Sequence, residues 1–97
     1  MNELRRAAPP RTPANLPILL VEDDADALAI YTLALEHAGF PVLAALDGEH
    51  AIRLAIERAP ALVILDLGLP IVDGLSALRA LRTDPATHHI PVLVLTA

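Results

Sequence analysis

Residues 18–24 have the sequence ILLVEDD, in which four apolar side chains are followed directly by three acids. A segment that is apolar at every position, and not only at alternate positions, is typical of a strand buried on both faces of a parallel sheet. Three similar apolar runs follow at residues 42–46, 61–65 and 92–95. The sequence therefore predicts four short strands with both faces covered.

The segment after the first of these runs has the pattern of a helix. Asp24 and Asp26 stand at its start, Gly39 stands at its end, and apolar residues recur every three or four positions: Leu28, Tyr31, Leu35 and Ala38. Acids near the N-terminus and a glycine after the C-terminus are typical helix boundaries. We therefore expect an amphipathic helix here, with Tyr31 in the core.

Two further helices are predicted between the remaining runs. Asp47-Gly48 marks the turn before the second helix and Pro60 ends it, whereas Ser76 is expected to cap the third, which gives way to a polar loop at residues 83–89. Strands that alternate with helices predict an α/β fold, an open and doubly wound parallel sheet with helices on both faces. In such sheets ligands bind beyond the carboxyl ends of the strands, where the strand order reverses.

Length and composition narrow the class of protein further. The chain has 97 residues, 55% of them hydrophobic, which suits one small domain at residues 16–97 after a flexible leader at residues 1–15 that contains proline and arginine. No apolar run reaches the roughly 18 residues of a membrane span. The first residues lack the apolar centre of a signal peptide, so we expect a soluble, cytoplasmic protein. The absence of cysteine excludes disulfides and thiol chemistry.

The charge argues against nucleic-acid binding by this segment. Twelve acids face seven bases, giving a net charge of −5, and all seven bases are arginine. Binding to a phosphate backbone requires a basic face, which this composition does not supply. We therefore expect no direct contact with nucleic acid, and none with a membrane.

The polar residues that follow the predicted strands include three acids. Glu22 and Asp23 come after the first strand, and Asp66 comes after the third. Like charges gathered in one cleft oppose compaction, so a counter-ion is expected. Oxygen ligands without sulfur suit a hard divalent cation, most simply Mg²⁺. Asp66, alone at the end of an apolar strand, is the candidate nucleophile for phosphoryl chemistry, and Gly68 lets the backbone approach the ion.

At these positions the sequence resembles the receiver domains of two-component response regulators. The resemblance spans residues 17–97 and rests on the following motifs, in chain order: Glu22-Asp23, Asp66, Leu69-Pro70, Asp73-Gly74 and Thr96-Ala97. It implies a flavodoxin-like sheet, which has the strand order 2-1-3-4-5 in the complete family fold. For the four strands of this sequence the implied order is 2-1-3-4.

The resemblance also implies a role for each matching residue. Asp66 would accept a phosphoryl group from a phosphohistidine of a sensor histidine kinase or a phosphotransfer protein. Asp23, Asp66 and the backbone carbonyl of Gly68 would bind Mg²⁺, Glu22 would act through a bound water, and Thr96 would be the switch hydroxyl. The implied function is signal transduction in a phosphorelay, and not metabolic catalysis.

Two features depart from the family's pattern. The chain contains no lysine, although receivers carry one after a fifth strand, and it stops at Ala97, before the helix, strand and helix that complete the family's fold. We therefore expect an incomplete receiver whose fourth strand has an exposed apolar edge. Such an edge favours a homodimer or an assembly with exchanged elements.

Two alternatives to phosphorylation signalling stay open. A degenerate receiver would use the same fold to dock proteins without being phosphorylated, which the missing lysine favours. A magnesium-dependent phosphatase with an aspartyl nucleophile is the other alternative. Such enzymes commonly place a second aspartate two residues beyond the nucleophile, and this sequence has Gly68 at that position.

Overall fold

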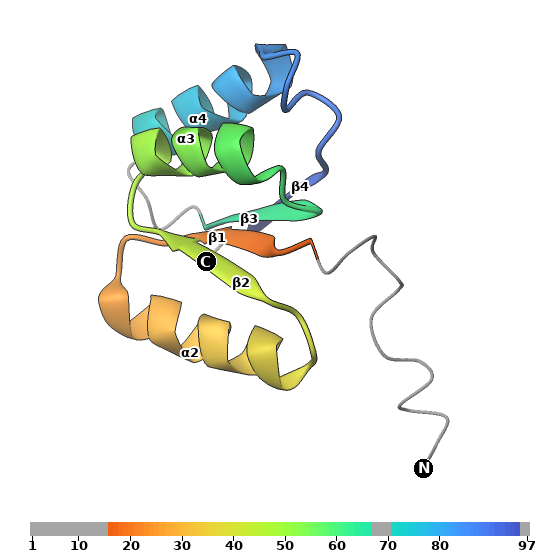
Figure 1. Ribbon diagram of the computed structural model, residues 1–97. Coiled ribbons are helices and arrows are strands. Elements are labelled where there is room, and N and C mark those ends of the chain that lie inside the picture. Colours follow the sequence, from red (N-terminus) through yellow and green to blue (C-terminus); the bar gives the residue numbers. More distant parts are fainter. Residues whose placement is uncertain (1–15, 67–70, 96–97) are drawn as a thin grey trace.

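A parallel sheet lies at the centre of the molecule between two helical layers (Figure 1). The computed structural model describes residues 16–66 and 71–95, except the side chains of residues 71–73. The strands are β1 (Ile18–Val21), β2 (Val42–Ala45), β3 (Leu62–Asp66) and β4 (Val92–Leu95). The helices are α2 (Ala25–His37), α3 (Gly48–Arg58) and α4 (Ile71–Thr83). The predictions about the leader, Gly68 and Thr96 concern residues outside this description.

The topology confirms the predicted fold class. The strands lie in the order β2-β1-β3-β4 and all pair in parallel. Figure 1 shows α2 on one face of the sheet and α3 with α4 on the other. The chain moves from β1 outward to β2 on one side, and from β3 outward to β4 on the other, so the strand order reverses between β1 and β3.

The core has two layers because successive strand residues point to opposite faces of the sheet. On the side of α3 and α4, the buried strand residues are Leu19, Val21, Ala45, Val63 and Leu65. On the side of α2, they are Ile18, Leu20 and Ile64. All four residues of β1 are buried, as expected for a central strand covered on both faces.

Helix ends follow the predicted turn chemistry in two of the three helices. After α2, Gly39 has a φ of 100°, which favours glycine, and its N–H donates to the Glu36 carbonyl at 3.0 Å. Before α3, the Asp47 carboxylate accepts the His50 N–H at 2.8 Å as an N-cap. Helix α3 ends at Ala59, which takes a left-handed conformation just before Pro60.

The prediction for the third helix is wrong at its start. Helix α4 begins at Ile71, so Ser76 lies in its second turn and is not a cap. The helix runs through Gly74, which is buried, and Ala77 is only 1% exposed. Small residues allow close packing of neighbouring helices, and this packing outweighs the turn preference of the Asp73-Gly74 pair.

The prediction that Tyr31 lies in the core is also wrong, since 38% of this residue is exposed. Leu28 and Leu35 occupy the side of α2 that packs against the sheet. Tyr31 falls between them in sequence but lies at the margin of that side. Leu28 and Leu35 are only half-buried, and no residue of α2 is fully buried.

Candidate functional site

The candidate site lies where β1 and β3 end side by side. Val21 is paired with Leu65 across these strands, so the next residue of each, Glu22 and Asp66, falls at the same carboxyl edge. The Glu22 N–H donates to the Ala45 carbonyl at 3.0 Å and continues the ladder toward β2. The central strands therefore fix the backbone of both acids at the point where the strand order reverses.

Glu22 is the buried member of this group. Only 3% of the residue is exposed, and its Oε2 atom accepts the backbone N–H of Asp24 at 2.9 Å. Its carboxyl group also shares hydrogen bonds with the side chains of Asp66 and Asp23. The hydrogen bond with Asp66, followed by burial, raises the pKa of Glu22 from its ordinary 4.5 to about 7. We conclude that the three acids gather in one cluster.

The neighbouring acids have separate roles. Asp24 is the N-cap of α2, and its Oδ1 atom accepts the Asp26 N–H at 3.1 Å. Asp23 is exposed to solvent, whereas Asp66 is half-buried. The run Glu22-Asp23-Asp24 thus combines a buried carboxyl group, an accessible carboxylate and a helix cap in three successive residues.

The donor atoms of the cluster match the chemistry of a hard divalent cation. All of them are carboxyl oxygens, the ligands that Mg²⁺ prefers. Within residues 16–66 and 71–95, no group of three or more His, Cys, Asp or Glu side chains is arranged so that it could hold a metal ion. The ligand set implied by the family resemblance does not require three such side chains as direct ligands. In that set Asp23 and Asp66 would bind the ion directly, and Glu22 would act through a bound water. Its remaining protein ligand, Gly68, lies outside the described residues, as does Thr96.

Sequence reasoning did not anticipate the burial of Glu22 or its bond to the Asp24 N–H. The available signal was its position directly after a strand buried at all four residues, because the next residue of such a strand still lies within the sheet. In the described residues, every buried side-chain nitrogen or oxygen has a hydrogen-bond partner. The buried carboxyl group of Glu22 is therefore part of a satisfied network.

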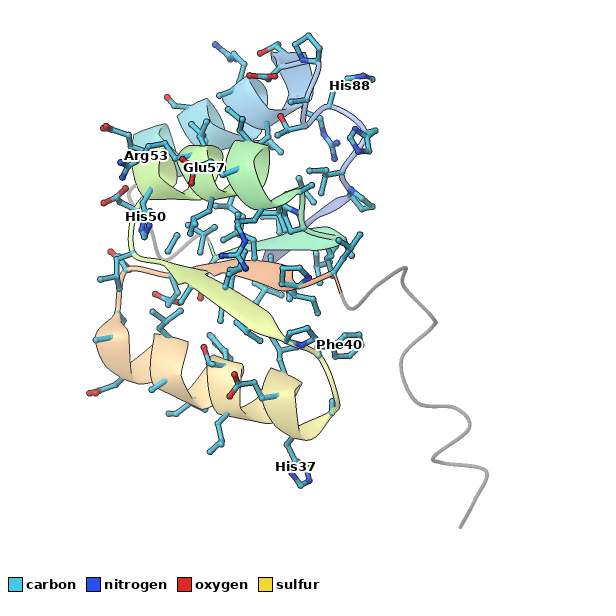
Figure 2. The ribbon with its side chains drawn as sticks, in the orientation of Figure 1. His37, Phe40, His50, Arg53, Glu57 and His88 are labelled. Atoms are coloured by element: carbon cyan, nitrogen blue, oxygen red, sulfur yellow. The ribbon has the colours of Figure 1, made fainter. Side chains whose placement is uncertain are left out.

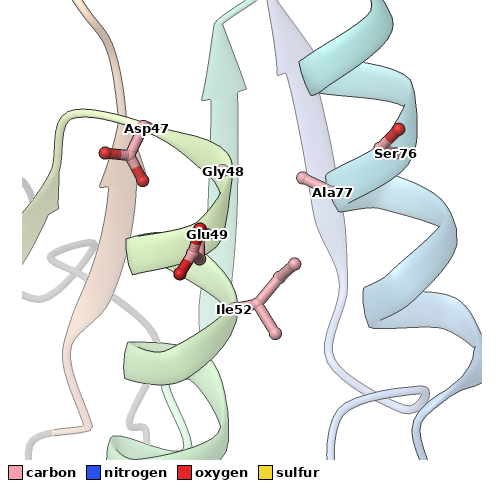
Figure 3. Close-up of a pocket in the computed structure, with 6 residues that line it drawn as sticks. All are labelled: Asp47, Gly48, Glu49, Ile52, Ser76 and Ala77. Atoms are coloured by element: carbon pink, nitrogen blue, oxygen red, sulfur yellow. The ribbon is translucent and has the colours of Figure 1, made fainter.

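A separate hollow of about 340 Å³ lies between α3 and α4 (Figure 3). Its described lining residues are Asp47, Gly48, Glu49, Ile52, Ser76 and Ala77. None of the three clustered acids is among them. Asp47 is already engaged as the cap of α3. Among the described residues, the hollow and the acid cluster therefore share no side chain.

The fold and the position of the acids define a class, that of doubly wound α/β domains whose site lies at the strand-order switch point. The model of the response regulator receiver domain family matches residues 18–97. This chain belongs to the response regulator receiver domain family, which confirms the resemblance seen in its sequence.

The chain matches only part of the length of its curated relatives. The transcriptional regulatory protein PrrA of Mycobacterium tuberculosis is 41% identical over 80 residues, which are 82% of this chain and 34% of PrrA. The chain thus spans about a third of the length of PrrA and of the related regulators that it matches. The output of such longer proteins is therefore not assigned by the match.

Solved structures of receiver domains resemble this chain over most of its length. The N-terminal domain of a response regulator receiver protein from Methanoculleus marisnigri has a TM-score of 0.79 at 36% identity, covering 84% of this chain and 67% of that one. The receiver domain of the sensor histidine kinase PA1611 from Pseudomonas aeruginosa has a TM-score of 0.79 at 33% identity, covering 87% and 69%. That structure holds a magnesium ion coordinated in its active site cleft. None of the three described helices of the present chain has the length and hydropathy needed to span a membrane.

Proposed function

We propose that this chain is a receiver module that accepts a phosphoryl group on Asp66, with Mg²⁺, from a histidine kinase or a phosphotransfer protein. The observation that carries the proposal is the cluster at the switch point, in which the buried Glu22 carboxyl shares hydrogen bonds with Asp66 and Asp23. A chain that gathers three acids at this cost in charge repulsion gains from a cation and an incoming phosphoryl group. Family membership supports the same assignment.

The chemistry assigned to Asp66 is a substitution at phosphorus. A carboxylate oxygen of Asp66 attacks the phosphorus of a phosphohistidine and forms a new P–O bond, while the P–N bond breaks. The electron pair of the broken bond stays on the imidazole nitrogen, which leaves as part of the donor. Because Asp66 is the last residue of β3, the strand holds its backbone in place during this transfer.

The chain's own oxygens would hold the cation. Asp23 and Asp66 would be direct ligands, together with the carbonyl of Gly68. Glu22, buried beside them, would orient Asp66 and accept a hydrogen bond from a bound water. When bound, Mg²⁺ neutralises negative charge on the phosphoryl oxygens. In this proposal the module is a phosphoacceptor, and not a metabolic enzyme.

The test is phosphorylation of the intact protein by a small donor such as acetyl phosphate, followed by intact-mass spectrometry. We expect one phosphoryl group per chain in the presence of Mg²⁺ and none after chelation. Asp66→Asn should lose the adduct. The matched control is Asp47→Asn, which makes the same change at an exposed acid after β2, keeps a capping side chain and should be labelled like the wild type.

Each alternative has its own result. An adduct that persists in Asp66→Asn would refute Asp66 as the acceptor. A folded wild-type protein that takes no phosphoryl group from any donor would instead indicate a docking receiver without phosphorylation. A phosphatase would release inorganic phosphate over many turnovers from phosphomonoesters, which a colorimetric phosphate assay measures.

A further inference from the structure

Of the described helices, only α2 lies on its face of the sheet, and two of its apolar side chains are uncovered (Figure 1). Ile30 is 65% exposed and Leu33 is 69% exposed, more than any other large hydrophobic side chain in the described residues. Leu28 and Leu35 occupy the opposite side of the helix, against the sheet. Two exposed apolar residues three positions apart on one helix form a contiguous patch, which is a feature of surfaces where proteins associate.

The patch is the middle of a four-residue stripe on the side of α2 that faces away from the sheet. Spacings of four, three and four residues place its members on one helix face. In chain order they are Asp26, Ile30, Leu33 and His37. In Figure 2 the His37 side chain points away from the sheet. We call these four residues the α2 outer stripe.

The α2 outer stripe is symmetric about its centre. An acid and an imidazole stand at its two ends, each four residues from the nearer apolar side chain. Consider a second copy of the helix that runs antiparallel, related by a two-fold axis level with the point midway between Ile30 and Leu33. Leu33 of that copy then lies at the height of Ile30, and its His37 lies at the height of Asp26. The stripe is therefore complementary to itself, as the interface of a two-fold symmetric dimer has to be.

The electrostatics of α2 suit this antiparallel arrangement. At each end of the paired stripes, the His37 imidazole of one copy faces the Asp26 carboxylate of the other. A neutral imidazole donates a hydrogen bond to a carboxylate, and a protonated one forms an ion pair with it. The positive N-terminus of each helix dipole also lies beside the negative C-terminus of the other helix.

Repulsion between acids is the main term against association. Residues 22–52 contain no lysine or arginine, and the exposed Asp23, Asp24 and Asp26 gather at the N-terminal end of α2. In the antiparallel pair the two copies of Asp26 are about 16 Å apart along the helix axis, which exceeds the screening length of about 8 Å at physiological salt. A parallel pair would place these acids side by side. The charges therefore disfavour a parallel pair and permit an antiparallel one.

We propose that the α2 outer stripe binds a second copy of this chain, and that the two helices pair antiparallel with Ile30 against Leu33 and Asp26 against His37. One helix face buries less than the roughly 800 Å² per partner of a standard interface, so the dimer is weak, with a dissociation constant on the order of 0.1 mM. The inference does not depend on phosphorylation of Asp66, and it concerns a surface other than the β4 edge.

Sedimentation equilibrium of the full chain, at concentrations from about 10 μM to about 1 mM, measures the association. Ile30→Glu with Leu33→Glu should weaken it at least about tenfold, because four like charges would meet at the centre of the dimer. The matched control is Ile56→Glu, since Ile56 is 44% exposed on α3, on the other face of the sheet. It should associate like the wild type, and thermal unfolding should show that all variants are folded.

An exchange of charge tests the pairing at the ends of the stripe. His37→Asp should weaken the dimer about fivefold, because Asp26 of each copy would then face an acid. Adding Asp26→Lys to this variant should restore the association, because each new lysine faces the new aspartate of the other copy. A double variant that associates no better than His37→Asp alone would overturn the antiparallel pairing.

Cross-linking tests the register, and the absence of cysteine from the chain makes introduced thiols specific. In a mixture of Asp26→Cys and His37→Cys, a short bismaleimide should join one copy of each. Asp26→Cys by itself should not cross-link, because its two thiols would lie about 16 Å apart along the axis. Ready cross-linking of Asp26→Cys alone would overturn the register. A wild-type chain that stays monomeric at about 1 mM, or unchanged association of the Ile30 and Leu33 double variant, would overturn the proposal as a whole.

Discussion

At the scale of single residues, Glu22 links the site to the stability of the fold. Its pKa is raised from 4.5 to about 7 by the hydrogen bond with Asp66 and by burial. A carboxyl group with a raised pKa in the folded state binds a proton that the unfolded chain has released. At a pH between these two pKa values, the folded state therefore holds more protons than the unfolded state. The stability of the fold consequently falls as pH rises through this range.

This linkage predicts the behaviour of Glu22→Gln. As pH rises from 4.5 to about 7, the free energy of unfolding of the wild-type protein should fall by on the order of 3 kcal/mol. The variant has no carboxyl group at this position and should not show this fall. In Mg²⁺-free buffer we expect the variant to be the more stable protein at pH 8, and this advantage to shrink toward pH 4. Urea denaturation at a series of pH values measures the difference.

Glu49→Gln is the control for this experiment. It makes the same chemical change at a glutamate that is exposed on α3, away from the cluster. It should keep the wild-type dependence on pH. A pH dependence that is equally steep in Glu22→Gln and in the wild type would show that Glu22 is not the residue responsible.

At the scale of elements, the end of α3 contains a local strain. Ala59 has a φ of 46°, in the left-handed region where a Cβ atom costs about 1–2 kcal/mol. Glycine removes this cost but gives the unfolded chain more freedom, which offsets part of the gain. We expect Ala59→Gly to stabilise the protein by about 0.5–1 kcal/mol, measured by denaturant unfolding.

Ala29→Gly provides the comparison, since Ala29 is an exposed position inside α2. Glycine in a helix interior costs about 1 kcal/mol relative to alanine, so this variant should be less stable than the wild type. The two substitutions are chemically identical and should change stability in opposite directions. A loss of stability in both would contradict the strain assigned to Ala59.

The elements also differ in how far local pattern determines them. Strands β1 and β4 have the predicted bounds. Strand β2 ends one residue earlier than predicted, and β3 begins and ends one residue later than predicted. Buried parallel strands are easily predicted because they are apolar at every position. The start of α4 differs from the prediction because Gly74, a poor helix former, lies inside the helix, where it is buried in the tertiary structure.

At the scale of the whole molecule, the two helical layers are held unequally. Helix α2 has no buried residue, whereas α3 has three, Gly48, Ala51 and Ala55. Helix α4 also contributes Ala77 and Leu81 to the core. Regions with few buried apolar contacts open more readily than the rest of a fold. The layer formed by α2 is therefore the weaker one in the described structure.

Hydrogen exchange followed by mass spectrometry tests this difference. We expect the amides of α2 to exchange faster than those of α3 and of the described part of α4 in the free protein. Protection of α2 equal to that of α3 in the free protein would contradict the weak packing of this layer.

Strand β4 lies at the edge of the described sheet. Within the described residues β4 pairs only with β3, and Leu93 and Val94 are 49% and 36% exposed. This exposure agrees with the apolar edge expected from the sequence. The homodimer or exchanged assembly through that edge stays a prediction.

The sequence by itself determined the class of fold, the order of the elements and the three acids at strand ends, because apolar runs, caps and glycine stops are local signals. Only the tertiary structure decided that Glu22 is buried and shares hydrogen bonds with Asp66 and Asp23, that Asp24 serves as a cap, and that Tyr31 is exposed. The reason is physical: a residue's burial and partners depend on which distant segments pack against it, and one chain segment does not contain that information.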